Sequence, residues 1–102
     1  MTTKTAQFTP GPWVAERDTA RNAYAWKVTG AKGVVEDIAR LALVDSVSQI
    51  EANATLIAAA PAMYAIIKDM REAFYVKGTR KALLAVMERS RDVIAQAEGR
   101  QA

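Results

Sequence analysis

The chain has 102 residues, is 51% hydrophobic and 25% charged, and carries a net charge of +3. This length is sufficient for one domain, residues 1–102, and the composition is that of a folded protein. The sequence has neither cysteine nor histidine, which excludes disulfides, thiolate metal sites and the most common general base and metal ligand. The carboxylates are not spaced as a metal cluster, so we predict no metal site and no cofactor.

The N-terminal part of the sequence predicts a small antiparallel sheet. Residues 1–12 are polar and then proline-rich, which is typical of a flexible or extended arm. Residues 13–45 are predicted to form the sheet, with the first strand beginning at Trp13 and a polar hairpin loop over residues 16–22. Residues 24–29 alternate aromatic and β-branched side chains, which favours a second strand.

Residues 34–44 leave two interpretations open. Both faces of this stretch are largely apolar, and short apolar runs do not separate strand from helix. We take it as a third strand, interrupted at Glu36-Asp37, and keep a helix over residues 34–43 as the alternative.

Residues 48–99 are predicted to be helical. Ser48-Gln-Ile-Glu51 has the pattern of a capping box that starts the first helix. Small residues in this helix would allow close approach to the sheet, so we expect it to link the two layers. Pro61 ends it and can begin the next helix, where its missing N–H costs nothing. One face of this helix carries the apolar residues Ile50, Ala54, Ile57 and Ala58.

Two further helices should form an antiparallel hairpin, because the connection between them is short. Gly78 suits the left-handed position after the second helix, and Thr79 can cap the third, which would end at Gly99. The predicted buried stripes are Met63, Ile67, Met70 and Phe74 in the second helix and Leu83, Met87, Ile94 and Ala97 in the third. The fold class is α+β: a three-stranded meander followed by three helices.

Three motifs give the chain a family resemblance. Thr9-Pro-Gly-Pro-Trp13, Ile38-Ala39 and Ala52-Asn-Ala-Thr-Leu-Ile-Ala-Ala-Ala-Pro61 occur in this order, and the chain thereby resembles a widespread group of small phage and prophage proteins over roughly residues 8–75. It departs from their pattern after Pro61, where Ala62-Met63-Tyr64 replaces an acidic residue and paired leucines.

A weaker similarity links the chain to phage sponge proteins, which oppose the Thoeris defence system by sequestering cyclic nucleotide signals. This resemblance implies a homo-oligomer that binds a nucleotide-type small molecule in the host cytoplasm.

Basic residues are the first candidates for such binding. Residues 61–102 hold eight basic and five acidic side chains, and hence the excess positive charge. Arg71, Lys77 and Arg80 lie around the predicted turn of the hairpin, together with Lys68 and Lys81, and could hold phosphates. The alternative is a solvated helical surface partly neutralised by Asp69 and Glu72.

Asn53 and Trp13 complete the candidate binding residues. The Asn53 amide could read a polar ligand edge, or it could bond backbone near a helix start. The Trp13 ring could stack on a base, or it could belong to the core or to a subunit contact.

Catalysis and membrane binding are not expected. Without histidine, no familiar base is available to activate a nucleophile, and adjacent Glu36 and Asp37 would point to opposite faces of a strand. No apolar run reaches the ~18 residues that span a bilayer, and no signal peptide is apparent. The third helix mixes charges on its polar face, which favours packing against a partner.

The sequence therefore predicts a phage anti-defence protein that sequesters a nucleotide-derived immune signal without turnover. One alternative is an inhibitor that binds a host defence protein directly, in the manner of anti-CRISPR proteins. The other is a weak nucleic-acid-binding accessory protein, which the modest net charge disfavours.

Overall fold

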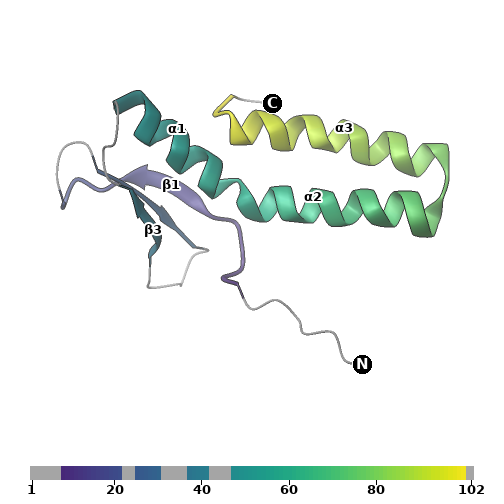
Figure 1. Ribbon diagram of the computed structural model, residues 1–102, viewed down its shortest axis with the longest axis horizontal. Coiled ribbons are helices and arrows are strands. Elements are labelled where there is room, and N and C mark those ends of the chain that lie inside the picture. The colour runs from purple at the N-terminus through teal and green to yellow at the C-terminus, as the bar shows by residue number, and fades with distance from the viewer. Residues whose placement is uncertain (1–7, 22–24, 31–36, 42–46, 101–102) are drawn as a thin grey trace.

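The computed structural model describes residues 8–21, 25–30, 37–41 and 47–100. Three strands precede the helices, as predicted (Figure 1). Residues 37–41 are a strand, and the remainder of residues 34–44 lies outside the described residues. The elements are β1 (Val14–Arg17), β2 (Trp26–Thr29), β3 (Asp37–Leu41), α1 (Val47–Ala58), α2 (Ala60–Glu72), the π-helical turn η1 (Ala73–Lys77) and α3 (Arg80–Ala97).

The sheet is an antiparallel meander in the order β1-β2-β3. Side chains alternate between its faces, and the apolar row Ala15–Val28–Ala39 faces α1. The predicted loop over residues 16–22 begins too early, because Glu16 and Arg17 belong to β1. Glu16 remains in the strand as the cross-strand partner of Lys27, with 3.7 Å between the charged groups.

The loop between β1 and β2 is held by one arginine. The Arg21 Nε donates to Asp18 Oδ2 at 2.8 Å, and its Nη2 donates to the carbonyl of Trp26 at 2.9 Å. A longer bond of 3.4 Å reaches the carbonyl of Leu41 in β3. Arg21 thus connects the loop to β2 and β3.

Helix α1 covers the apolar face of the sheet. Val28 and Ala54 are fully buried where the two layers meet, and Ala58 is 8% exposed. Small side chains let the helix backbone approach β1 and β2 closely, as predicted. Trp13, Trp26, Leu41 and Ile57 pack around this cluster.

The N-terminal segment packs against the junction of α1 and α2. A Cβ added at Gly11 would lie 2.8 Å from the Cβ of Pro61, so glycine is required by this close approach. Trp13 Nε1 donates to the carbonyl of Thr9 at 3.0 Å, and the ring of Phe8 meets Tyr64 edge to face at 5.1 Å. The first and third sequence motifs therefore contact each other across the fold.

The first helix begins one residue earlier than predicted. Val47 is its first residue, so Ser48 lies inside the helix and is not the N-cap of the predicted capping box. The helical ladder then breaks at Ala59, and Pro61 occupies the first turn of α2 as expected. Proline removes one backbone donor there, which accounts for a bend at this position.

The second and third helices form the predicted antiparallel hairpin. Gly78 adopts the left-handed conformation with φ +62°, and the Thr79 hydroxyl accepts from the backbone N–H of Ala82 at 3.1 Å. Ile66, Ala73 and Val86 form the small core between the two helices. The predictions made for Gly78 and Thr79 from local sequence are therefore confirmed.

The buried stripes of the hairpin differ from the predicted ones. Met63, Met70, Leu83 and Ala97 are half-buried, but four predicted core residues are exposed. Each helix carries apolar residues over a wider sector than one neighbouring helix can cover, and Ile66 and Val86 occupy the contact. The exposed fractions are 56% for Ile67, 61% for Phe74, 58% for Met87 and 54% for Ile94.

The hairpin projects away from the sheet, and its core is separate from that of the sheet (Figure 1). Among the described residues, no helix by itself is long and apolar enough to cross a bilayer. Only a pair bent by 44°, Ser48–Ala58 with Ala60–Lys77, has the necessary length and composition.

Candidate binding site

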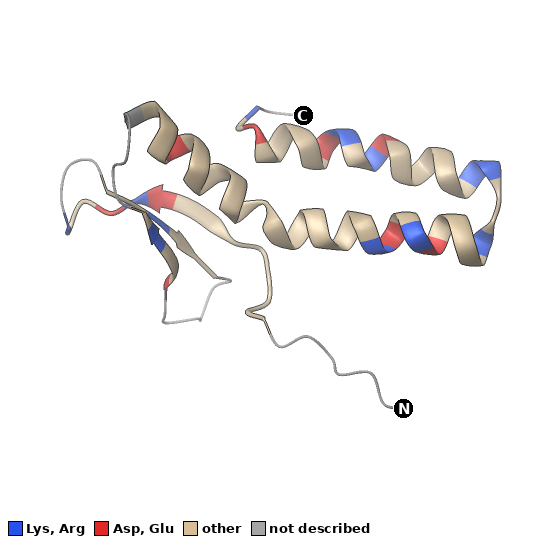
Figure 2. Cartoon of the chain, viewed as in Figure 1, with Lys and Arg blue, Asp and Glu red and all other residues tan. Residues whose placement is uncertain are grey.

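Positive charge gathers at the far end of the hairpin, which we call the tip: residues 77–81. Figure 2 shows basic residues at the adjoining ends of both helices. Lys77, Arg80 and Lys81 are exposed, and none of the three forms an ion pair within the described part of the chain. The carboxylate of Asp69, by contrast, is paired with Arg89 further along the hairpin.

Two aromatic residues, Phe74 and Tyr75, lie in the π-helical turn just before these cations. The π-helical turn closes with a bond of 2.9 Å from the N–H of Gly78 to the carbonyl of Ala73. Tyr75, in this turn, is 71% exposed and meets Phe74 edge to face at 4.9 Å between ring centroids. The guanidinium of Arg71 lies 5.3 Å from the centroid of the Tyr75 ring. Such a contact between cation and ring holds both side chains in place at the surface.

The tip therefore offers two kinds of contact at once. Unpaired cations can bind an anion, since guanidinium and ammonium groups both donate to phosphate oxygens. Exposed rings can stack on a planar base, since every base offers a π-face. Lys77 and Arg80 lie at the tip, and Arg71 contacts the ring of Tyr75 in the turn before it.

Asn53 does not belong to the tip. It is exposed on α1, beyond the bend at Ala59 and at the other end of α2. The helix from Ala60 to Lys77 alone spans about 27 Å at 1.5 Å per residue. One chain therefore cannot bring the Asn53 amide and the tip cations onto one small ligand.

Trp13 is also remote from the tip. Its ring is half-buried and packs against the cluster of Val28, Ala54 and Ala58, and its indole N–H is already bonded to Thr9. The structure places this residue in the core, one of the two interpretations considered for it.

Tyr75 is a candidate that the sequence prediction missed. Phe74, Tyr75 and Val76 are consecutive, and three successive large side chains cannot all face one neighbouring helix. That pattern before Gly78 could have indicated exposed rings beside the turn. Val76 is in fact 76% exposed.

The described residues show no metal-binding arrangement. Within the ranges 8–21, 25–30, 37–41 and 47–100, no group of three or more acidic residues is placed to hold a metal ion. The groups that the tip offers to a ligand are basic side chains and, in the turn before them, aromatic rings.

The relationships of the chain agree with the phage resemblance of its motifs. No curated protein and no solved structure matches it significantly. The family model described as Salmonella phage P22 protein Y8K6 matches residues 1–101, and the chain therefore belongs to this phage protein family.

Proposed function

We propose that this phage protein binds a nucleotide-type phosphate ligand at the hairpin tip and holds it without turnover. The observation that supports this function is a set of three exposed cations without an ion pair among the described residues, Lys77, Arg80 and Lys81, in the turn that follows the exposed Tyr75.

Each side chain has a part in such binding. Arg80 can take two phosphate oxygens with its planar fork, while Lys77 and Lys81 act as point charges. The ring of Tyr75 can stack on the base, and Arg71, on one face of that ring, keeps it oriented. These groups bind and orient, and the proposal assigns none of them a chemical step.

Stoichiometric capture fits a role against host defence. A protein that removes a nucleotide signal must hold it in a fixed site and release it slowly. The family is a phage family, and the sponge proteins that oppose Thoeris provide the pattern for this activity in the host cytoplasm.

The test is binding of defined cyclic nucleotides to the purified protein. Cyclic dinucleotides, cyclic trinucleotides and cyclic ADP-ribose isomers are dialysed against it, and the retained ligand is recovered and analysed by mass spectrometry. We expect one of these classes to bind and to be recovered intact. Arg80→Ala should weaken binding by roughly tenfold or more, which corresponds to a lost charged hydrogen bond.

Arg89→Ala is the matched control, because it removes the same charge from the same helix away from the tip. Equal losses of affinity in the two variants would show that net charge alone explains the effect, which would contradict a site at the tip. Recovery of a chemically altered ligand would contradict capture without turnover. Retention of generic DNA alone, with strong salt dependence, would favour the nucleic-acid alternative.

A further inference from the structure

An uncovered apolar surface runs along one side of the hairpin. Six large hydrophobic residues are 46% to 61% exposed there, and their spacings of three or seven residues place those of each helix on one side. We call this surface the hairpin face: Tyr64, Ile67 and Phe74 from α2, and Leu84, Met87 and Ile94 from α3.

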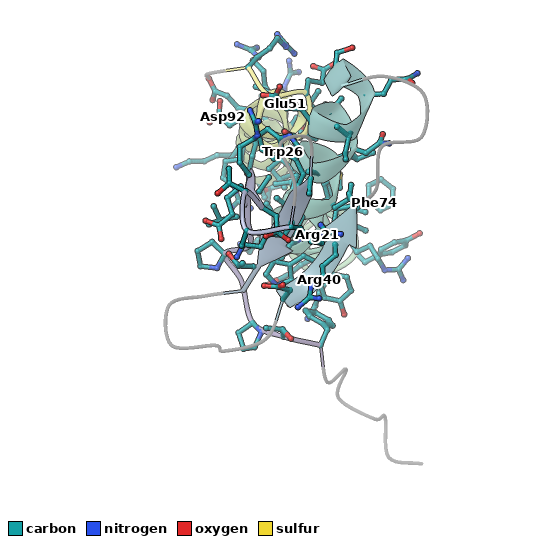
Figure 3. The ribbon with its side chains drawn as sticks, turned by 90° about the vertical axis from the view of Figure 1, so that its left-hand side faces the viewer. Arg21, Trp26, Arg40, Glu51, Phe74 and Asp92 are labelled. Carbon is teal, nitrogen blue, oxygen red and sulfur yellow. The ribbon has the colours of Figure 1, made fainter. Side chains whose placement is uncertain are left out.

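The two helices contribute to the same side of the hairpin. Asp69 and Arg89 bond to each other across the hairpin, and each lies two residues after a member of the face, Ile67 or Met87. Two residues correspond to a rotation of about 200° around a helix, so the ion pair marks the opposite side. In Figure 3, viewed along the hairpin, Phe74 and Asp92 accordingly lie on opposite sides.

The spacing along this face is that of a helix-pairing seam. In α3, steps of four and three residues alternate through Arg80, Leu84, Met87, Arg91, Ile94 and Glu98. The same alternation runs through α2 at Ala60, Tyr64, Ile67, Arg71 and Phe74. Alternating steps of three and four keep a stripe facing a partner helix over several turns.

We propose that the hairpin face is covered by a second copy of this chain, with the two α3 helices side by side and antiparallel. The charges at the two ends of the seam select this direction. Arg80 at one end of the seam would meet Glu98 of the second copy at the other end, and its remaining N–H donors would stay available to a phosphate. Leu84 would meet Ile94 of the second copy. The two-fold axis then passes between the two α3 helices at residue 89. Near the axis, Arg71 turns its guanidinium toward Tyr75 and Arg91 is exposed, so both can stay at the solvent edge of the seam.

The α2 seam meets the same axis. The Asp69–Arg89 ion pair shows that residue 89 of α3 lies beside this part of α2. The axis therefore passes α2 close to Asp69, which puts Ile67 two residues from the axis and near Ile67 of the second copy.

The opposite choice, with both tips at the same end, is unfavourable. It would gather Lys77, Arg80 and Lys81 of both copies, and like charges repel at such distances. Glu98 is bonded to Arg100 of its own chain, yet its side chain is exposed and can accept from a second arginine.

The area of the face is sufficient for a stable pair. Two helices, each about 25 Å long and 10 Å wide, present on the order of 500 Å² per copy, or about 1,000 Å² for the pair. This is the area at which specific interfaces begin. An antiparallel pair also carries the tip of one copy toward α1 of the other, because Gly99, after α3, lies close to α1: a Cβ added there would be 3.6 Å from the methyl group of Thr55.

Light scattering on the ligand-free protein is the first test, and it is independent of nucleotide binding. We expect a dimer for the natural sequence and a monomer for Ile94→Glu, whose folding is checked by circular dichroism. Ala85→Glu is the matched control: it adds the same charge to an exposed position of α3 off the face and should remain dimeric. A monomeric natural protein, or a dimer that Ile94→Glu leaves intact, would overturn the proposal.

Disulfide trapping tests the direction of pairing, because the natural chain has no cysteine. Ile67→Cys should cross-link to itself on mild oxidation, since it lies within two residues of the axis. Phe74→Cys should not, because it lies five residues from the axis, and the two copies of this position are therefore about 15 Å apart along the helices. Cross-linking of Phe74→Cys but not of Ile67→Cys would contradict the antiparallel pair, as would a monomer that instead captures a host protein through this face.

Discussion

The two halves of the molecule differ in how completely their apolar residues are covered. The sheet and α1 enclose Val28 and Ala54, which are fully buried, and the N-terminal segment closes one end through Gly11 and Trp13. The hairpin has a small core around Ile66, Ala73 and Val86 and leaves an apolar side exposed. The first half, which we call the closed half, therefore covers its own core, whereas the hairpin leaves part of its apolar surface uncovered.

The largest effect should come from the closed half. Val28→Ala removes two methyl groups from a position with no solvent exposure, and a cavity of this kind costs about 2–3 kcal/mol. The measurement is the free energy of unfolding from urea denaturation. Leu84→Ala, at 56% exposure on the hairpin, is the comparison, and an equal loss in a monomeric sample would contradict the difference between the halves.

Gly11→Ala tests the contact between the N-terminal segment and Pro61. The added methyl would lie 2.8 Å from a Pro61 carbon, and such overpacking costs about 2 kcal/mol. Thermal unfolding is the measurement. In a Pro61→Gly background, which lacks the Pro61 Cβ, Gly11→Ala should cost much less than in the natural chain. An unchanged melting temperature of Gly11→Ala in the natural chain would contradict the steric explanation.

Thr79→Ala tests the turn at the tip. The substitution removes the hydroxyl that accepts from the N–H of Ala82, and loss of an N-cap costs about 1 kcal/mol. Thr79→Ser keeps the acceptor and should restore most of the stability. If serine were no better than alanine in urea denaturation, the cap would not be the cause.

Asp69→Asn should have the smallest effect. Both partners of the Asp69–Arg89 ion pair are about half exposed, and exposed pairs contribute about 0.5 kcal/mol, less at high salt. The check is the free energy of unfolding at two salt concentrations. A loss above 1 kcal/mol would show that this pair does more than mark one side of the hairpin.

Local signals predicted more of the fold than of the candidate site. The turn at Gly78 and Thr79 and the helix break at Pro61 depend on neighbouring residues, and the sequence predicted them. The role of Arg21 depends on Leu41, distant in sequence, so a local pattern could not indicate it.

The hairpin stripes show the limit of periodicity. A helical period identifies an apolar sector, but it does not say which part of the sector faces the neighbouring helix and which part stays exposed. Ile67 and Met87 fit the period and yet are exposed. In the same way, Asn53 and Arg71 both suit ligand binding by chemistry, and only the bend and the length of α2 show that they lie apart.

Hydrogen exchange at two protein concentrations would test the closed half and the hairpin in one experiment. We expect amides of β2 and α1 to exchange at the same rate at both concentrations, and amides near Ile67 and Met87 to exchange more slowly at the higher one. Equal exchange in the hairpin at both concentrations, across a range spanning micromolar to millimolar protein, would contradict the account of the hairpin as an arm that binds a second copy.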